Sequence, residues 1–462
     1  EGNNVYTQTN GTVNGNVTGG TDDDTFIIDG GRINGNLDLE AGNNSLTTRN
    51  SAIISGTFAT GNGNDTVTFG SGTVISGTTA FGNGTNLVSA TNTTFRGNVS
   101  LGTGTNTLYL VNSDLSGTLA MTGTDTVYIS GSTPFTQKGA FSGINTLNIS
   151  ESTVHSRYSL GTVDTLNLQR AAVLNVSTSQ VLGSSGVVNV NASTLNIAAG
   201  AHVSASTWNF TNNGTLGIHV ASSASYGSIG ASDFNGGSLT IHLASNAGYI
   251  NSGTQMLIVS GSGGASILPS LTTTTQGLYT FSVALVDNRD VSLTINRQAT
   301  TAAATNSGNS AIAARLDAIS STQNTQLLTV QSNIGNATSL AAVNNILDSL
   351  NPAGGTGAAM ANVGTSVATG NQVSNRLAML RGSKAGMNTG DGMFSNHLWV
   401  QGFGNITKQD DKDGVKGYDA SGYGTSVGVD TDTLVDGMNT GMALSYGNGS
   451  VVFNEPVNNV HA

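Results

Sequence analysis

The chain of 462 residues contains no cysteine, and only 9% of its residues are charged. The absence of cysteine excludes disulfides, thiolate metal sites and cysteine nucleophiles. The formal net charge is -11, and the Lys and Arg residues are scattered along the sequence. Because no basic stripe exists to neutralise phosphates, nucleic acid is excluded from the predicted partners.

Two kinds of apolar segment are also missing from the sequence. No apolar run is long enough for a transmembrane helix. The first residues, Glu1 to Asn4, have neither the basic start nor the apolar run of a signal peptide. We therefore expect the chain to be a mature form or a fragment.

Glycine and small polar residues are abundant instead. The chain has 63 glycines, and Asn, Thr and Ser crowd the first three hundred positions. A disordered polar chain would carry more charge and fewer regularly placed Val, Ile and Leu residues. The chain is therefore expected to fold.

A repeat organises the first part of the chain, in which an Asp or Asn followed by alternating apolar residues recurs every 19 to 21 residues. These anchors are Asp24, Asn44, Asp65, Asn86, Asn106, Asp125, Asn145 and Asp164. An apolar series runs in phase with them through Val13, Ile33, Ile54, Ile75, Phe95, Leu115, Phe135, Val154 and Val173. Two or three short strands and Gly-rich corners in about twenty residues are typical of one coil of a parallel β-helix.

If these coils stack, the sequence predicts how many coils there are and how the anchor side chains are arranged. If the pattern continues to Arg297, roughly fifteen coils are expected, each about 4.8 Å above the last. Within the anchor series no two Asp residues are consecutive. We therefore expect one column in which side chains hydrogen-bond from coil to coil and carboxylates stay about 10 Å or more apart.

The composition changes after this solenoid. Strand-like pieces separated by Gly and Asn over residues 236–297 predict a terminal cap that shields the last coil. Near Thr300 the chain becomes Ala-rich, which predicts a helical linker with helical stretches over residues 340–350 and 367–381.

After Asn396 the apolar period returns to two. From Tyr423 to Asp430 one face is Tyr, Thr, Val and Val, and the other is Gly, Ser, Gly and Asp. From Asn439 to Tyr446 one face is Thr, Met, Leu and Tyr, and the other is small or polar. Such strands are typical of a transmembrane β-barrel, although a soluble sandwich edge would alternate similarly.

Three stretches in this region resemble the opening of the barrel domain of monomeric (type Va) autotransporters of Gram-negative bacteria. They are Leu398-Trp399-Val400-Gln401-Gly402-Phe403-Gly404, Gly417-Tyr418-Asp419-Ala420-Ser421-Gly422-Tyr423-Gly424 and Gly428-Val429-Asp430-Thr431. The repeat region is similar to pertactin-like passengers of the same family.

The resemblance implies a right-handed parallel β-helix presented at the cell surface by type V secretion, with the C-terminal part in the outer membrane. It implies four domains: the β-helix passenger (residues 1–235), an autochaperone-like cap (236–300), a helical linker (301–395) and the first strands of the barrel (396–462). Only about three strands fit into the last segment, whereas even the smallest membrane barrels have about eight. We therefore expect a truncated β-barrel.

Few residues qualify as a catalytic or metal site. The segment Gly61 to Val67 resembles a calcium-binding nonapeptide, but the equivalent positions in other coils become Asn and the period is about twenty instead of nine. The histidines of the passenger, His155, His202, His219 and His242, are expected to be isolated. No nucleophile motif of a serine protease is present. We predict no catalytic residue, no metal and no cofactor.

Two weaker signals remain. Asp22, Asp23 and Asp24 form the one acidic cluster of the passenger, which is interpreted as a solvated turn. Asn344-Asn345 resembles the Asn-Asn junction that some family members cut autocatalytically, but it lies 54 positions before Trp399.

The predicted function is that of a surface-exposed passenger, not an enzyme, which acts in adhesion or aggregation and so in virulence. A long polar face would offer many weak hydrogen bonds to host glycans, to matrix or to another copy of the chain. One alternative is a glycan-cleaving β-helix enzyme with Asp22 to Asp24 as its site. Another alternative is a passive spacer.

Overall fold

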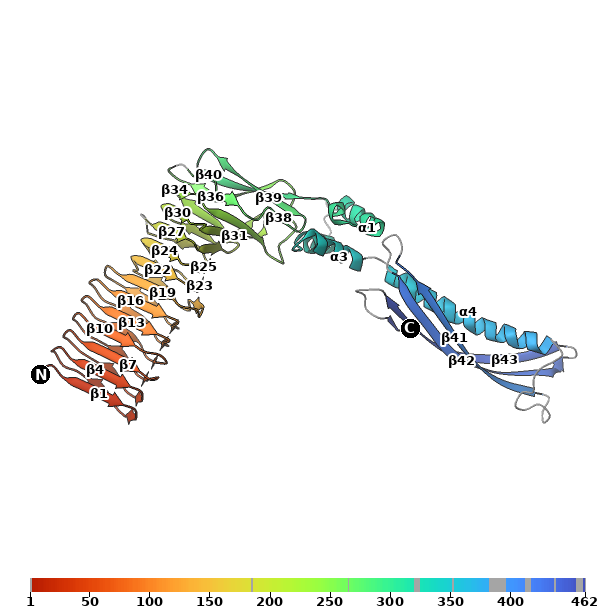
Figure 1. Ribbon diagram of the computed structural model, residues 1–462, viewed down its shortest axis with the longest axis horizontal. Coiled ribbons are helices and arrows are strands. Elements are labelled where there is room, and N and C mark those ends of the chain that lie inside the picture. Colours follow the sequence, from red (N-terminus) through yellow and green to blue (C-terminus); the bar gives the residue numbers. More distant parts are fainter. Residues whose placement is uncertain are drawn as a thin grey trace. The chain divides into compact units, whose positions relative to one another are not determined.

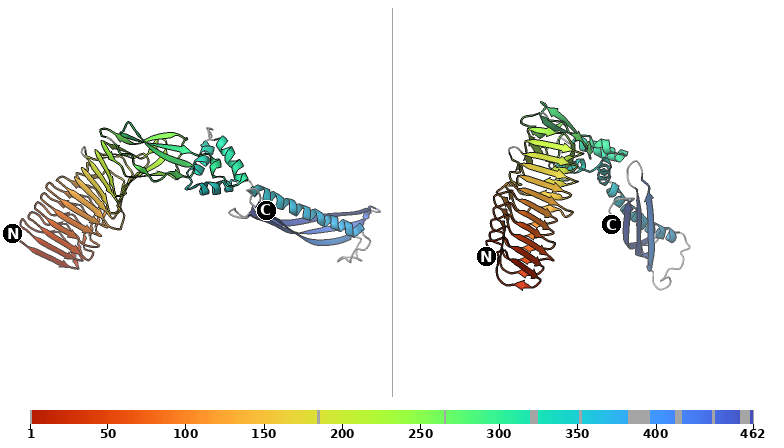
Figure 2. Two further views of the ribbon diagram at one scale, coloured as in Figure 1. Left: turned by 45° about the horizontal axis from the view of Figure 1, so that its top comes forward. Right: turned by 60° about the vertical axis from the view of Figure 1, so that its left-hand side comes forward.

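The computed structural model describes residues 2–183, 186–264, 266–319, 325–350, 353–381, 396–411, 417–435, 438–453 and 460–461. The chain forms two compact units, one of residues 1–298 with 324–337 and the other of residues 299–323 with 338–462. The first unit contains a stack of short parallel strands, and the second contains helices and long antiparallel strands (Figures 1 and 2). The predicted fold class is confirmed as mainly β, with a parallel β-helix, helices and antiparallel strands like those of a β-barrel. The four domain boundaries stay predictions.

The longest sheet, called sheet A, has twelve parallel strands that pair in chain order. They are β1 (Val5–Thr9), β4 (Thr25–Asp29), β7 (Ser45–Arg49), β10 (Thr66–Phe69), β13 (Leu87–Thr91), β16 (Thr107–Val111), β19 (Thr126–Ser130), β22 (Thr146–Ser150), β24 (Thr165–Gln169), β27 (Val187–Asn191), β30 (Thr207–Thr211) and β34 (Asp233–Asn235). Sheet A thus has about three coils fewer than the fifteen expected from the sequence.

Two sheets of shorter strands complete the N-terminal coils. Sheet B contains β2 (Thr12–Val13), β5 (Arg32–Ile33), β8 (Ile53–Ile54), β11 (Val74–Ile75), β14 (Thr94–Phe95) and β17 (Asp114–Leu115). Sheet C contains β3 (Val17–Thr18), β6 (Leu37–Asp38), β9 (Phe58–Ala59), β12 (Thr79–Phe81), β15 (Val99–Leu101), β18 (Leu119–Met121) and β21 (Phe141–Ser142).

Two other sheets complete the later coils. Sheet D contains β20 (Phe135–Thr136), β23 (Thr153–Ser156), β25 (Val173–Val176), β28 (Thr194–Ile197), β31 (Thr215–Ser222), β35 (Ser238–Leu243) and β37 (Ser270–Leu271), with β32 (Ser225–Tyr226) paired to β31. Sheet E contains β26 (Gln180–Val181), β29 (His202–Ser204), β33 (Ser228–Ala231), β36 (Thr254–Gly261), β40 (Asp290–Arg297), β39 (Tyr279–Val286) and β38 (Thr275–Gln276).

A proline explains why sheet B ends at β17. In each earlier coil the first residue of this strand donates its backbone N–H to the coil before, as Asp114 does to the Thr93 carbonyl at 2.8 Å. The corresponding residue one coil later is Pro134, which has no N–H to donate. Phe135 therefore starts sheet D instead of continuing sheet B, so the single apolar series predicted from the sequence divides into two sheets.

The same series is wrong by one residue at its end. Val154 pairs with Leu174, not with the predicted Val173. Two successive residues at this corner, Arg170 and Ala171, have positive φ angles of 55° and 59°, whereas the previous coil has only Glu151 in that conformation. The corner is one residue longer, which moves the buried position to Leu174.

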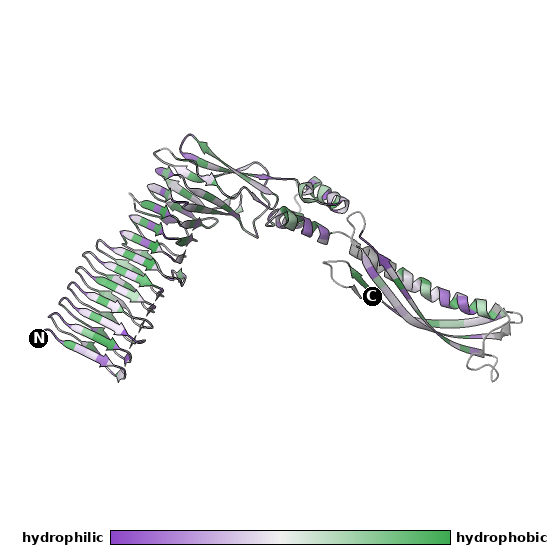
Figure 3. Cartoon of the chain, viewed as in Figure 1, coloured by the Kyte–Doolittle hydropathy of each residue, from purple (hydrophilic) through white to green (hydrophobic). Residues whose placement is uncertain are grey.

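The core of the solenoid is a continuous apolar column. Within each strand of sheet A alternate side chains are buried, as in β10, where Val67 and Phe69 are 0% exposed. Phenylalanines from different coils pack edge to face, with ring centroids 5.4 Å apart for Phe58 and Phe69 and 5.5 Å apart for Phe69 and Phe95. Apolar bands accordingly recur on successive strands of the solenoid (Figure 3).

The parallel coils give way to antiparallel strands at the C-terminal end of this unit. Strand β40 pairs antiparallel with both β36 and β39. The three-residue turn between β39 and β40 contains Asp287 and Asn288 with φ angles of 51° and 57°, and the Arg289 N–H donates to the Val286 carbonyl at 3.1 Å, as in a type I′ turn. Helix α2 (Thr325–Gly335) belongs to this unit, where Asn336, just after its end, donates its side-chain N–H to the Ala247 carbonyl at 2.6 Å.

The second unit begins with the 3-10 helix η1 (Thr300–Ala303), followed by α1 (Ser307–Ala318), α3 (Leu340–Ser349) and α4 (Ala353–Arg381). The start of α4 lies fourteen residues before the predicted position 367. Glycine and threonine near its start are weak helix formers, but packing of α4 against the following sheet overrides this propensity. In the part of the chain that the structure describes, no helix is both long and apolar enough for a membrane span.

The sheet of the second unit is antiparallel. It consists of β41 (Asn396–Gln409), β42 (Tyr418–Val435), β43 (Met438–Phe453) and the short β44 (Val460–His461), paired in chain order. The three long strands agree with the first strands of a β-barrel, as the sequence predicted.

The predicted Asp/Asn column is confirmed. From Asp24 to Asp125, the backbone N–H of each anchor donates to the side-chain oxygen of the anchor in the next coil, as from Asp65 to Asn86 at 3.0 Å, from Asn86 to Asn106 at 3.2 Å and from Asn106 to Asp125 at 3.1 Å. At the end of the series the Asn145 side-chain amide donates to Asp164 instead, at 3.0 Å. Asn4, which the sequence repeat missed, starts the column by donating to Asp24 at 2.7 Å. The anchors from Asp24 to Asp125 are at most 1% exposed. The column therefore joins coils from inside the solenoid.

The buried column makes a prediction for Asp65→Asn. Burial raises the pKa of the Asp65 carboxyl above its ordinary value of 3.8, so the folded state binds the proton more tightly than the unfolded state. Stability should therefore rise as the pH falls through the folded pKa and level off below 3.8. Asparagine has no ionised form, so its burial does not cost the free energy of burying a carboxylate. Its amide could also donate to a carbonyl four residues earlier, as Asn86 does to Gly82 at 3.0 Å.

We expect Asp65→Asn to have a higher guanidinium midpoint than the parent at pH 7, with the difference disappearing near pH 4. The midpoint is followed by circular dichroism from pH 8 to 4, with Glu40→Gln at an exposed corner as the matched control. A variant less stable than the parent at pH 7 would contradict the role assigned to this carboxylate.

Candidate functional site

The acidic cluster of the first coils is engaged in contacts between coils. Asp22 accepts the Gly2 N–H at 2.5 Å, and Asp23 accepts the Asn43 N–H at 2.6 Å. Asp24 is 1% exposed and belongs to the buried column. These contacts favour the interpretation of a structural turn over a pair of catalytic carboxylates.

The segment Gly61 to Val67, which resembles a calcium-binding nonapeptide, also contributes to contacts between coils. Its one carboxylate, Asp65, is 1% exposed and lies in the column between Asn44 and Asn86. Among the residues that the structure describes, no group of three or more His, Cys, Asp or Glu side chains could hold a metal ion. The absence of catalytic residues, metals and cofactors stays a prediction.

The histidines are less isolated than the sequence suggested. His219 and His242 lie on the neighbouring strands β31 and β35, and their rings stack with centroids 4.7 Å apart. Burial lowers the pKa of both rings below the ordinary 6.5, and the charge of His242 lowers that of His219 further. Both shifts favour the neutral form of the rings.

A column of outward side chains runs along the centre of sheet A, one from each strand. Its members in chain order are Thr7, Ile27, Thr47, Thr68, Ser89, Tyr109, Tyr128, Asn148, Asn167, Asn189, Asn209 and Asn235. Tyr109 and Tyr128 stack with ring centroids 4.6 Å apart and an interplanar angle of 10°.

The last five members of this column form a continuous ladder of amides, which we call the Asn ladder. The amide N–H of each residue donates to the side-chain carbonyl one coil earlier: Asn167 to Asn148 at 2.9 Å, Asn189 to Asn167 at 2.8 Å, Asn209 to Asn189 at 2.9 Å and Asn235 to Asn209 at 2.8 Å. All four hydrogen bonds point in the same direction, so the amide dipoles add along the solenoid.

The Asn ladder retains hydrogen-bonding capacity on its outer side. An amide has two donor hydrogens and two acceptor lone pairs, and each interior member uses one of each within the ladder. Asn167, Asn189 and Asn209 are half-buried and Asn235 is exposed. Asn148 is buried, at 9% exposed, so the ladder presents one donor and one acceptor per coil from Asn167 to Asn209, about 4.8 Å apart.

The anchor repeat did not reveal this ladder, although the sequence contains a signal for it. An Asn between two buried apolar residues recurs in Leu147-Asn148-Ile149, Leu166-Asn167-Leu168, Val188-Asn189-Val190 and Trp208-Asn209-Phe210. A shorter series exists on sheet D, where Asn175 lies between His155, at 3.3 Å, and Asn196, at 2.8 Å. Gly217 follows in the next strand and ends this series because it has no side chain.

In the second unit, the two faces of the antiparallel sheet differ as the sequence predicted. Apolar side chains on one face are exposed; they include Leu398, Val400, Ile406, Val427, Val429, Met442, Leu444 and Tyr446. The other face combines glycines and serines with buried aromatic side chains such as Trp399, Phe403 and Tyr418, and helix α4 packs against it through contacts with β41, β42 and β43. An exposed apolar band on one face of such strands is typical of a membrane β-barrel.

Glycines make room for aromatic and helical side chains on the covered face. Trp399 is paired across the strands with Gly428, where a Cβ atom would lie 2.3 Å from the indole ring. A Cβ on Gly447 would lie 2.8 Å from the Thr365 methyl group of α4. The glycines therefore allow α4 to approach the sheet closely.

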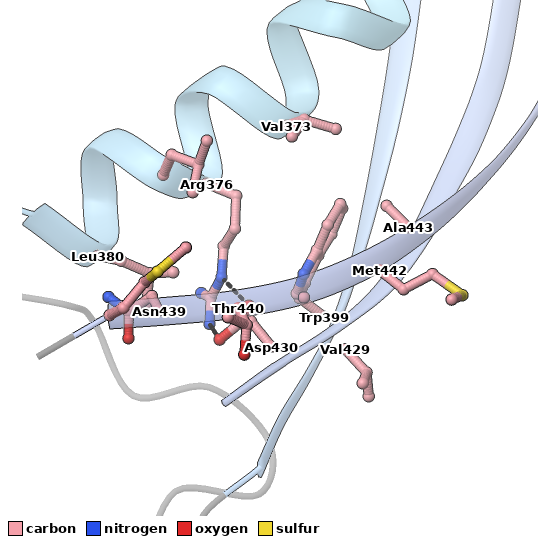
Figure 4. A pocket seen from close by; sticks show the side chains of 13 residues that line it. Val373, Arg376, Leu380, Trp399, Val429, Asp430, Asn439, Thr440, Met442 and Ala443 are labelled. Carbon is pink, nitrogen blue, oxygen red and sulfur yellow. Dashed lines mark hydrogen bonds and ion pairs between the residues drawn. The ribbon is translucent and has the colours of Figure 1, made fainter. Parts of the chain in front are cut away.

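A buried ion pair joins the end of α4 to the sheet. Arg376 donates through Nε and Nη2 to the two carboxylate oxygens of Asp430, at 2.9 and 3.2 Å. The two side chains are only 7% and 9% exposed, and His397 Nδ1 lies 3.4 Å from Asp430 Oδ1. The pair lines a pocket of about 390 Å³ together with Trp399 and Met442 (Figure 4).

The Asn344-Asn345 junction lies within helix α3. The Asn344 side-chain carbonyl accepts the amide N–H of Asn309 and the backbone N–H of Thr305, at 3.0 and 3.1 Å. These bonds fasten α3 to α1 and the segment before it, which favours a structural role for the junction.

One comparison with known proteins is informative. Residues 398–462 match the family model of the autotransporter beta-domain. The match covers the three stretches whose resemblance the sequence already indicated. No curated protein is significantly similar to the chain.

The ion pair makes a double-variant prediction. Arg376→Leu leaves a buried carboxylate without its bidentate partner, which should destabilise the packing of α4 by about 3–5 kcal/mol. The double variant Arg376→Leu/Asp430→Leu should recover most of this loss because no uncompensated charge remains. Hydrogen exchange of the α4 amides in the detergent-solubilised chain measures the effect.

The exposed Arg315 of α1 provides the control, since Arg315→Leu removes the same charge without breaking a buried pair. If the double variant exchanged as fast as Arg376→Leu, the loss would come from packing of the arginine side chain and not from the unpaired carboxylate.

Proposed function

We propose a binding function for the passenger of this chain, which is a type Va autotransporter of a Gram-negative bacterium with its passenger outside the cell and its C-terminal domain in the outer membrane. The passenger, meaning the solenoid unit that precedes the β-domain, acts as an adhesin or aggregation factor and not as an enzyme. Its partners are host surface glycans, matrix or a second copy of the passenger.

The Asn ladder is the observation that carries this proposal. It is an outward array of donors and acceptors at a fixed spacing, held in position by the hydrogen bonds between its own members. Each single contact with a partner is weak in water, but many contacts made at once give high avidity. A repetitive ligand, such as a polysaccharide or another ladder, could use several coils together.

The two alternatives have less support. A glycan-cleaving enzyme would need free carboxylates, whereas Asp22, Asp23 and Asp24 each accept a backbone N–H from a neighbouring coil. A passive spacer would need the buried column but has no use for aligned amides on the outer side of sheet A.

The adhesin proposal predicts the behaviour of Asn167→Ser/Asn189→Ser/Asn209→Ser. Cells that display this variant should lose attachment or clumping at least tenfold, because three consecutive rungs lose their amides. Surface display is checked by protease accessibility, and folding by circular dichroism. Attachment is counted on glycan-coated and matrix-coated surfaces, and clumping is followed by settling.

The matched control is Asn62→Ser/Asn83→Ser/Asn98→Ser. These residues also accept hydrogen bonds from the next coil, at 3.1, 2.9 and 3.0 Å, but they lie at corners outside sheet A. Equal losses in both triple variants would refute the role of the ladder. Shortening of oligosaccharides by the purified chain, abolished in Asp23→Asn, would favour the enzyme instead.

A further inference from the structure

A groove of about 370 Å³ lies on sheet E, over the neighbouring strands β26, β29, β33 and β36. It is separate from the Asn ladder, which belongs to sheet A. Its polar lining consists of one imidazole and five hydroxyls, from His202, Ser204, Ser206, Ser232, Ser260 and Ser262.

The imidazole of His202 is held in place with one nitrogen directed at the groove. Its Nδ1 lies 2.9 Å from Ser228 Oγ, and its backbone N–H donates to Ser179 Oγ at 3.1 Å. A Cβ atom built on Gly230 would lie 3.1 Å from both His202 Nε2 and Ser204 Oγ. These two polar atoms therefore lie close together over the Gly230 backbone and both line the groove.

The floor of the groove at Gly230 is held by a buried hydrogen bond. The Gly230 carbonyl accepts the indole N–H of Trp208 at 3.0 Å, and Trp208 is fully buried. Ser204, Gly230 and Ser260 occupy matching positions on three adjacent strands. Because Gly230 has no side chain, His202 and Ser204 can approach its backbone closely, and any larger residue would displace them.

The hydroxyls of the lining can both donate and accept. Ser260 and Ser262 donate to backbone carbonyls at 3.4 and 3.3 Å, and the Ser262 hydroxyl also lies 3.2 Å from the Ser232 hydroxyl. The Ser260 oxygen remains an acceptor, whereas Ser232 and Ser262 are partly engaged with each other. For Ser204 and Ser206 the structure gives no side-chain hydrogen bond to any residue it describes. The groove thus offers several hydrogen-bonding groups that water or a ligand can use.

The groove carries no formal charge and has an apolar component. Its described lining contains no Lys, Arg, Asp or Glu. Val181 at the rim is 73% exposed, while Ala205 and Ala231 form part of the floor. A sulfate or phosphate would meet no permanent cation here, on a chain whose net charge is -11.

We infer that this groove binds a neutral sugar residue of a glycan, with its hydroxyls on His202 and the serines and a C–H face against Val181. A sugar combines hydroxyls with apolar C–H faces, which matches a lining of hydroxyls beside an exposed valine. The volume lies at the small end of ligand sites, as suits one or two sugar residues. The inference rests on the proposed adhesin function and names the class of ligand.

The test uses the full chain in detergent and three probes: methyl α-glucopyranoside, methyl β-galactopyranoside and N-acetylglucosamine. Binding is measured by saturation-transfer NMR, and the inference expects at least one probe to bind. Gly230→Val fills the groove and should weaken this binding at least tenfold. His202→Ala removes a hydrogen-bonding group without filling the groove and should also weaken it.

Folding of both variants is checked by thermal unfolding. The control is Gly248→Ala, because a Cβ at Gly248 would meet no atom within 4 Å and sugar binding should stay unchanged. The inference is overturned if none of the three sugars binds, if binding survives in both groove variants, or if acetate or sulfate competes as well as the sugars.

The ladder variant separates this inference from the proposed function. Asn167→Ser/Asn189→Ser/Asn209→Ser should keep sugar binding in the groove, because these residues lie on sheet A. If that variant loses attachment while Gly230→Val leaves sugar binding unchanged, the groove inference fails and the adhesin proposal stands. If Gly230→Val loses sugar binding while the triple Asn variant attaches as well as the parent, the groove inference stands and the ladder proposal fails.

Discussion

Coil-to-coil hydrogen bonding in strict vertical register is the constraint on which the passenger depends. In the turns up to Asn145, each turn presents a side-chain oxygen to the backbone N–H of the turn before, as in the bond from Asp65 to Asn86. This bond is buried, so an anchor out of register would leave polar groups unsatisfied in the core. Once the anchors align, the strands on either side of them pair in parallel. Side chains at equivalent positions of successive coils then stack on one another, both in the core and on the surface.

The same vertical register also produces the surfaces that we propose bind partners. Outside the core, identical side chains at matching positions become ladders, of which Asn148 to Asn235 is the longest run of one residue type in the outer column of sheet A. Where a coil has glycine instead, as at Gly230, side chains of the neighbouring coil approach the backbone closely and line a groove. An extended polar face and a small groove thus arise from one repeat, and they suit a repetitive partner and a single sugar respectively.

The β-domain is organised differently, because the two faces of its antiparallel sheet have different environments. Apolar residues such as Leu444 are exposed on one face, while glycines on the other admit Trp399 and helix α4. Arg376 and Asp430 then bury opposite charges as a bidentate pair. Helix, glycines and ion pair depend on one another, since α4 can reach Asp430 only where the sheet carries no bulky side chains.

The sequence by itself determined the repeat, the parallel solenoid, the anchor column and the family of the C-terminal strands, because each depends on residue types at a constant period along the chain. Only the tertiary structure decided where Pro134 diverts one sheet into another, which residue follows Val154 in the core, and that His219 stacks on His242. The Asn ladder and the groove at Gly230 also needed coordinates, because their members lie in different coils. Such contacts depend on corner lengths and on the direction of each side chain, and local pattern specifies neither.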